Sequence, residues 1–130
     1  MGGGLRRAGT VSRLKEILHK KRQREERLES ALQSVTARLR DLGALKVVVF
    51  GSLAHRDVDA FSDLDLLVVM PPERSGREWS RTIYESMDLG IASDLIIYNE
   101  KELEENLATS SFLRGILDSG RTVYEKTLRG

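Results

Sequence analysis

The strongest constraint on the fold is the stretch formed by residues 46–70, KVVVFGSLAHRDVDAFSDLDLLVVM. It contains two short apolar runs, residues 47–50 and residues 66–70, both rich in β-branched side chains. Runs of this kind, bounded by turn residues, predict buried strands. Gly51-Ser52 ends the first run and Pro71-Pro72 ends the second. The chain therefore places two core strands close together in sequence, joined by a loop.

Two aspartates, Asp63 and Asp65, stand at the beginning of the second strand. Because side chains alternate along a strand, the two carboxylates share a face and lie about 7 Å apart. Carboxylates so placed repel each other and are costly to desolvate. A divalent cation removes this cost, and Mg²⁺ prefers carboxylate and phosphate oxygens. Asp63 and Asp65 are therefore candidate metal ligands.

Gly51 and Ser52 directly follow the first strand and could bind a phosphate group. A glycine there lets the backbone approach a ligand closely, and the following turn can present its N–H groups to a phosphate. Each motif alone is common: G-S is an ordinary turn, and D-x-D is often a capped strand end. The combination of a strand, G-S, ten residues, D-x-D and a strand is more specific, and it indicates phosphoryl or nucleotidyl transfer.

A third strand is predicted over residues 91–98, IASDLIIY, and Asp94 interrupts its apolar pattern. If this strand neighbours the second one, Asp63, Asp65 and Asp94 converge on one place. Three such carboxylates could hold two metal ions about 3.5–4 Å apart. Asp94 could also accept the proton of the attacking hydroxyl group.

The first part of the chain is predicted to be helical. Apolar residues follow a 3-4 spacing from Val11 to Leu42, except at Lys21 and Glu25. This pattern predicts either one long amphipathic helix with an exposed middle or two helices with a break. We expect a disordered segment at residues 1–10, a helical extension at residues 11–27 and a single domain at residues 28–125. The heptad spacing would also permit a homodimer through the helix.

The remaining elements complete a small α/β fold. Residues 77–89 predict a helix with Trp79 in the core, and Gly90 is its stop. Asn99 and Glu102 form a predicted capping box at the start of a further helix. In the next helix Phe112 is expected to face inward with its apolar neighbours, and residues 121–125 predict a short edge strand. The expected architecture is a small mixed β-sheet flanked by helices.

Composition excludes several classes of function. The chain has no cysteine, which excludes disulfides and Cys-ligated zinc and fits a reducing compartment. No apolar run approaches the roughly 20 residues of a membrane span, so we expect a cytoplasmic protein without a membrane partner. Residues 1–40 hold 11 Lys and Arg against 4 Asp and Glu, and the remainder holds 10 against 16. Such a basic arm could bind RNA or an acidic partner. A solvated helix face is the simpler interpretation, and we expect no nucleic-acid partner.

These residues resemble a known family. The pattern of Gly51, Ser52, Asp63, Asp65 and Asp94 is similar to that of minimal nucleotidyltransferases of the DNA polymerase β superfamily. The resemblance covers about residues 28–125. It implies a polymerase-β-like nucleotidyltransferase fold and Mg²⁺-dependent transfer of a nucleoside monophosphate, with ATP as the expected substrate. It also implies that the three aspartates are the catalytic and metal-binding residues.

Small members of this superfamily resemble the antitoxin of a toxin–antitoxin pair. The resemblance implies transfer of AMP from ATP to a hydroxyl group of a helical HEPN-type protein partner, as a protein adenylyltransferase does. Two alternatives stay open: a non-catalytic module of the same fold that neutralises its partner by contact, and an enzyme acting on a small molecule such as an aminoglycoside. Many relatives read G-S-x-A-R-G, whereas this chain has His55 and Arg56 at the last two positions. Arg56 could take over the phosphate contact.

Overall fold

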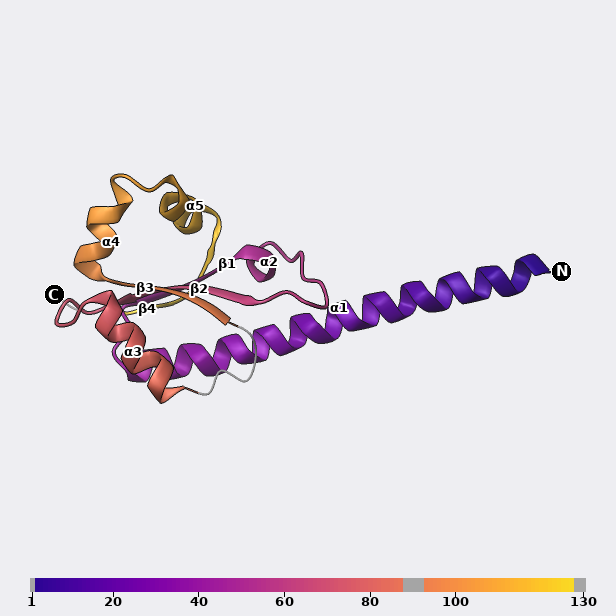
Figure 1. Ribbon diagram of the computed structural model, residues 1–130, viewed down its shortest axis with the longest axis horizontal. Helices are drawn as coiled ribbons and strands as arrows, with labels where there is room; N and C mark the ends of the chain where they lie inside the picture. Colours follow the sequence, from indigo (N-terminus) through magenta and orange to yellow (C-terminus); the bar gives the residue numbers. More distant parts are fainter. Residues whose placement is uncertain (1, 88–92, 128–130) are drawn as a thin grey trace.

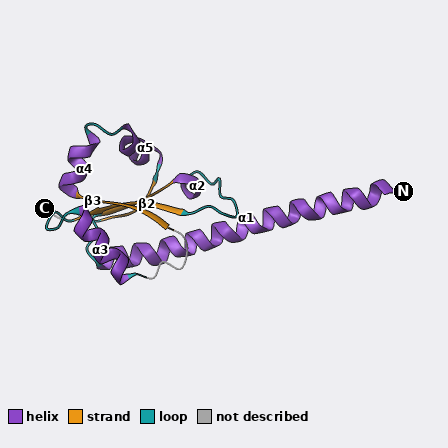
Figure 2. Cartoon of the chain, viewed as in Figure 1, coloured by secondary structure: helices purple, strands orange, loops and turns teal. Residues whose placement is uncertain are grey.

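The computed structural model describes residues 2–87 and 93–127. Figure 1 shows a small domain of sheet and helices from which one long helix projects. Figure 2 shows the same arrangement by secondary structure, with helices on both faces of one sheet. The predicted α/β class with a long N-terminal helix is confirmed. In chain order the elements are α1 (Gly2–Asp41), β1 (Lys46–Phe50), α2 (Gly51–Ala54), β2 (Leu64–Met70), α3 (Gly76–Ser86), β3 (Ser93–Asn99), α4 (Glu100–Leu107), α5 (Ser111–Ser119) and β4 (Arg121–Glu125).

The sheet has four strands in the order β3-β2-β1-β4. β1 runs antiparallel to both β2 and β4, whereas β2 and β3 are parallel. The parallel pair requires a crossover connection, and α3 provides it. The sheet is therefore mixed, as predicted, and β4 occupies an edge. The second and third predicted strands are direct neighbours.

Strand alternation gives the domain a core on each face of the sheet. In β2, Leu66 and Val68 belong to the core formed with α1 and α3. Leu67 points to the opposite face, where Leu113 and Ile116 of α5 complete a smaller core with α4. Figure 1 shows the two helix pairs on opposite sides of the sheet. The odd-numbered β2 residues, including Asp65, therefore face α4 and α5.

One unbroken helix, α1, accounts for the first 40 described residues. Of the two predicted possibilities, the single helix with an exposed middle is the correct one, since Lys21 is exposed while Leu28 and Leu39 are fully buried. The helix includes residues 2–10, for which the sequence predicts disorder. The division of the chain into segments stays a prediction. No helix in the part of the chain that the structure describes is long and apolar enough to cross a membrane.

Two capping boxes mark the beginnings of α3 and α4. Ser75 and Glu78 begin α3, and Asn99 and Glu102 begin α4, as predicted for the latter. Glu102 Oε1 also accepts a hydrogen bond of 2.8 Å from the Gly76 amide, which ties the two helix starts together. The predicted helix end at residues 89–90 and the predicted strand start at residue 91 lie outside the described residues.

Candidate active site

Gly51 makes the bend that ends β1. Its φ is +71°, a left-handed conformation that is strained for residues with a Cβ. A Cβ built on Gly51 would overlap the carboxylate of Asp65 and lie 3.2 Å from its Cγ. Asp65 is therefore packed directly against the bare backbone of the bend. Ser52 follows in the first turn of α2 and is half-buried. The structure brings the predicted phosphate-binding bend and a predicted metal ligand into contact.

Asp65 and Asp94 are neighbours across the parallel pair. They are register partners in β2 and β3, so their side chains point to the same face of the sheet. Neighbouring strands are about 4.8 Å apart, which puts the two carboxylates side by side. Asp63 lies in the loop just before β2 and is exposed, as is Asp94, while Asp65 is half-buried. All three predicted acidic residues thus lie at the end of the sheet where β2 and β3 begin.

The electrostatics of Asp65 reflect this crowding. The pKa of its carboxyl group is raised above the ordinary 3.8, first because burial penalises the charged form, then because the carboxylates of Asp94 and Asp63 repel it. In the described part of the chain, none of these three carboxylates forms an ion pair or a hydrogen bond with another protein group. Among the residues that the structure describes, their excess negative charge has no protein counter-charge, and a bound cation would supply one.

The donor set suits a hard divalent cation, since it consists of carboxylate oxygens beside a glycine bend open to a ligand. As they are oriented, however, no three His, Cys, Asp or Glu side chains among the described residues surround a single position that could hold a metal ion. Asp63 and Asp94 are exposed, so rotation about their χ angles would allow their carboxylates to turn toward that of Asp65. The residues fit Mg²⁺ by chemistry and by backbone placement.

A comparison with protein-family models identifies the family. Residues 28–121 match the model described as a nucleotidyltransferase domain. The match spans well over half of the chain and contains Gly51, Ser52 and the three aspartates of the site. The chain belongs to the nucleotidyltransferase domain family. No curated protein matches it in a comparison of the whole chain.

A solved structure supports the fold of this nucleotidyltransferase domain. The chain is similar to a provisionally assigned nucleotidyltransferase from Sulfolobus solfataricus, known from a crystal structure. The TM-score is 0.60 and the sequences are 15% identical, with 82% of this chain and 88% of that chain covered. At this identity the likeness concerns the fold alone. It places the mixed sheet and its helices in a known nucleotidyltransferase architecture.

Arg56 occupies the turn after α2 in the nucleotidyltransferase domain. Its φ is +55°, and its amide donates a hydrogen bond of 3.3 Å to the carbonyl of Leu53. The residue is exposed, and its guanidinium group makes no ion pair with any carboxylate of the described chain. A role for Arg56 in phosphate binding stays a prediction. The left-handed φ favours Gly at this position.

An aromatic pair beside the carboxylates was missed by sequence reasoning. Phe50, at the end of β1, is the register partner of Asp65 and shares its face. Phe112 of α5 meets it edge to face, with ring centroids 6.2 Å apart and planes at 88°. Phe112 is 61% exposed, so the expectation that it faces fully inward is wrong. It stands in the first turn of α5 and covers the end of β1 rather than the core. No pattern in the sequence places α5 over that strand end.

Proposed function

We propose that this chain transfers AMP from ATP to a hydroxyl group of a protein partner, with Mg²⁺ as cofactor, in the cytoplasm. The observation that carries the proposal is the placement of Asp65, which touches Gly51 on one side and is in register with Asp94 on the other. A phosphate-binding bend and a pair of carboxylates are the parts that nucleotidyl transfer needs, because this chemistry depends mainly on positioning and charge neutralisation.

Each part of the site has a distinct role in the proposed reaction. The amides of Gly51 and Ser52 bind the triphosphate, with Arg56 as an additional cation. Asp63 and Asp65 would hold Mg²⁺, which neutralises phosphate charge when bound. The acceptor oxygen attacks the α-phosphorus as the bond to the β-phosphate oxygen breaks, and pyrophosphate leaves. Asp94, on the far side of Asp65 from the glycine bend, accepts the proton of the acceptor hydroxyl.

The aromatic pair supports a nucleotide as the donor substrate. Phe50 lies on the β1 side of Asp65, opposite to Asp94. The phosphate-binding bend is on that same side, since Gly51 directly follows Phe50. A ring of Phe112 that is 61% exposed offers a face on which a purine base can stack. The nucleotide therefore occupies the β1 side of the site, and the acceptor approaches from the β3 side.

The protein acceptor is proposed as a helical HEPN-type toxin with which this chain forms an antitoxin pair. Beyond the matched residues 28–121, the described chain extends as the N-terminal part of α1. This helix offers a surface on which a protein acceptor can bind. Transfer to a small molecule such as an aminoglycoside is the alternative acceptor, and neutralisation by contact alone is the non-catalytic alternative.

The test is transfer of label from [α-³²P]ATP. The full-length chain is incubated with Mg²⁺ and the product of the neighbouring reading frame, if this encodes a helical protein, or with an aminoglycoside. Labelling of the protein, lost in Asp65→Asn and Asp94→Asn, supports the proposal. Asp118→Asn, in an exposed position of α5, is the matched control and keeps activity. Labelling of the aminoglycoside only, or protein labelling that survives both site variants, overturns it.

A further inference from the structure

The N-terminal part of α1 extends beyond the domain as an exposed helix. We define residues 11–22 as the α1 overhang. Val11, Leu14, Ile17 and Leu18 there are 50–55% exposed. Farther along the same helix, Leu28, Leu32 and Leu39 are almost completely buried against the sheet. Figure 1 shows this half of α1 well outside the layers of sheet and helices.

The exposed apolar side chains of the overhang form one stripe. Val11, Leu14 and Leu18 are separated by three and four residues, and Ile17 is three residues from Leu14, so all lie on one side of the helix. This is the side that is buried farther along α1, because the same spacing continues to Leu28. Among residues 11–87 and 93–127, whose burial the structure describes, four of the seven exposed large apolar residues gather here, the others being Phe61, Tyr84 and Phe112. A gathered apolar surface marks an interaction site more readily than scattered residues do.

The domain itself does not cover this stripe. Arg24 Nε donates a hydrogen bond of 2.9 Å to the Ser62 carbonyl. Among the described residues, this is the hydrogen bond between α1 and the rest of the domain that lies nearest the N-terminus. The overhang therefore presents an apolar face that tertiary contacts within the described chain leave open.

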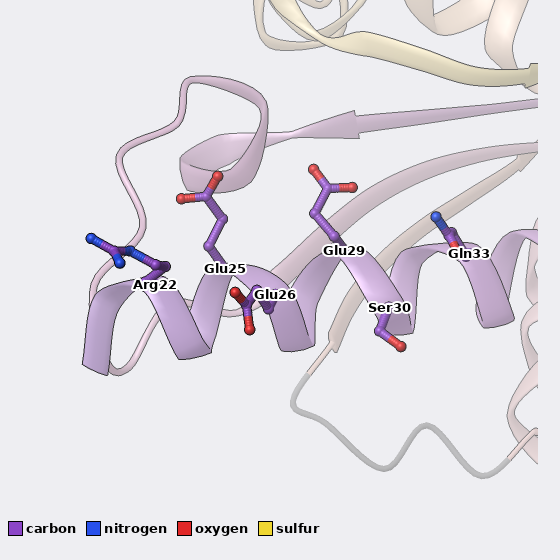
Figure 3. Close-up of a pocket in the computed structure, with 6 residues that line it drawn as sticks. All are labelled: Arg22, Glu25, Glu26, Glu29, Ser30 and Gln33. Carbon is purple, nitrogen blue, oxygen red and sulfur yellow. The ribbon is translucent and has the colours of Figure 1, made fainter. Parts of the chain in front are cut away.

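Charged side chains limit and flank the stripe. Figure 3 shows the hollow next to it on α1, where Glu25 and Glu29 project from one side of the helix and Glu26 from another. The overhang itself is basic, with Arg13, Lys15, Lys20, Lys21 and Arg22 against one acidic residue, Glu16. A second hollow on the overhang is lined by two cationic residues and one acidic residue among its six, which are Ser12, Lys15, Glu16, Leu18, His19 and Arg22. The binding surface is thus a short apolar stripe with basic edges.

This charge pattern argues against a second copy of the chain as the occupant. In a parallel pair that continued the heptad, Lys21 would face Lys21 and Glu25 would face Glu25 across the seam. Such like-charge contacts are unfavourable, and the overhang would bring one strongly basic segment against another. A partner with carboxylates beside its own apolar face would meet both features of this surface.

We propose that the α1 overhang is the docking site for an acidic amphipathic helix of a different protein. Its apolar face packs on Val11, Leu14, Ile17 and Leu18, and its Asp or Glu side chains pair with Lys15 and Arg22. This deepens the partner part of the proposed function. Its test uses no nucleotide, so failure of docking and failure of nucleotidyl transfer are separate results.

The experiment measures binding of fluorescein-labelled synthetic peptides to the full-length chain by fluorescence anisotropy. One 21-residue peptide carries Leu at heptad positions a and d with Glu at e and g, and its twin carries Lys in place of Glu. The acidic peptide is expected to bind at least tenfold more tightly than the basic twin, and less tightly as salt is added. Leu14→Glu with Leu18→Glu is expected to reduce its binding at least tenfold. Tyr84→Glu, an exposed apolar position on α3, is the control and leaves binding unchanged.

Four results would overturn the proposal. Equal binding of both peptides would show that the surface does not recognise acidic side chains. Unchanged binding of the acidic peptide to the Leu14→Glu and Leu18→Glu variant would show that the apolar stripe is not the binding surface. If sedimentation equilibrium shows that the wild-type chain is a dimer and that the variant is a monomer, the stripe binds a second copy of the chain. Binding of a 20-nucleotide single-stranded RNA, lost on Lys20→Ala with Lys21→Ala while neither peptide binds, assigns the basic edge to nucleic acid. The replaced leucines are exposed, so the variant keeps the fold, which circular dichroism checks.

Discussion

The bare Cα of Gly51 lies against the carboxylate of Asp65, and this contact joins the end of β1 to the start of β2. The contact depends on two properties of glycine. Its φ of +71° is strained for other residues, and the space that a Cβ would fill is already occupied by the carboxylate. The bend and the carboxylate therefore form one unit, and a change at either residue disturbs the other.

Gly51→Ala is expected to lower nucleotidyl transfer at least 100-fold, because the new Cβ displaces the Asp65 carboxylate. The left-handed φ also lowers the free energy of unfolding of this variant by about 1–2 kcal/mol. Gly115→Ala in α5 is the matched control, since no atom lies within 4 Å of a Cβ built there. It should keep activity and stabilise the chain by about 0.5–1 kcal/mol. Equal activities of the two variants would show that the bend does not position the carboxylate.

Asp65→Asn is expected to stabilise the chain at neutral pH while abolishing transfer. Because the pKa of Asp65 is raised in the folded chain, folded molecules bind more protons than unfolded ones between 3.8 and the higher folded value. The free energy of unfolding therefore falls as pH rises through this window and stays lower above it. The amide removes that penalty, so the thermal midpoint should rise at pH 7. The difference from the wild type should disappear below pH 3.8.

The effect of Mg²⁺ on the thermal midpoint tests the same repulsion between the carboxylates. Mg²⁺ is expected to raise the thermal midpoint of the wild type, because it neutralises the repelling carboxylates, and to have a smaller effect on Asp65→Asn. Differential scanning fluorimetry at several Mg²⁺ concentrations measures both, with Asp118→Asn as the control. A lower midpoint for Asp65→Asn than for the wild type at pH 7 would mean that the carboxylate stabilises the fold, contrary to the crowding argument.

Much of this fold could be predicted from local patterns in the sequence. The β-branched runs before Gly51 and after Asp65 give β1 and β2, and the Asn99–Glu102 capping box gives the start of α4. These features depend on neighbouring residues only, which is why the sequence alone reveals them. The expected convergence of Asp65 and Asp94 requires that their strands are neighbours, and the register of β2 and β3 confirms this condition.

Features set by distant contacts could not be read in this way. The apolar pattern placed Phe112 inward, but the position of α5 over the end of β1 exposes its ring beside Phe50. The length of α1 has a local cause instead, although the apolar pattern alone left it open. Lys21 and Glu25 interrupt its apolar pattern, yet the backbone stays helical there because Lys and Glu have good helix propensity.

Phe112→Ala is expected to weaken binding of ATP about fivefold or more, because base–aromatic stacking contributes about 1–3 kcal/mol. Binding of inorganic triphosphate, which has no base, should stay the same. Phe112→Tyr keeps the ring and should keep ATP affinity. Tyr84→Ala removes an aromatic ring of similar exposure from α3, on the opposite side of the sheet, and is the control. Isothermal titration calorimetry measures each affinity. An equal loss of affinity for ATP and for triphosphate would indicate a general change of the site instead of lost stacking.

Asn99→Ala is expected to destabilise the chain by about 1–3 kcal/mol without changing turnover of the folded enzyme. Asn99 is only 8% exposed. Its Oδ1 accepts a hydrogen bond of 2.7 Å from the Glu102 amide, and its Nδ2 donates one of 2.9 Å to the Arg74 carbonyl. Alanine removes the cap and leaves both backbone groups without these partners. The residue ends β3, whereas Asp94 lies near its beginning, so the effect should concern stability alone.

Two further variants separate the contributions of this side chain. Asn99→Asp keeps the acceptor for the Glu102 amide but lacks the donor for Arg74, so it should cost less than alanine. Ser110→Ala removes the N-cap of α5, which makes one such bond, to the Leu113 amide at 3.2 Å, and should cost about 1 kcal/mol. Urea unfolding measures all three. A cost for Asn99→Ala no larger than that for Ser110→Ala would mean that the bond to Arg74 contributes nothing, and that the loop before α3 is held by its own capping box.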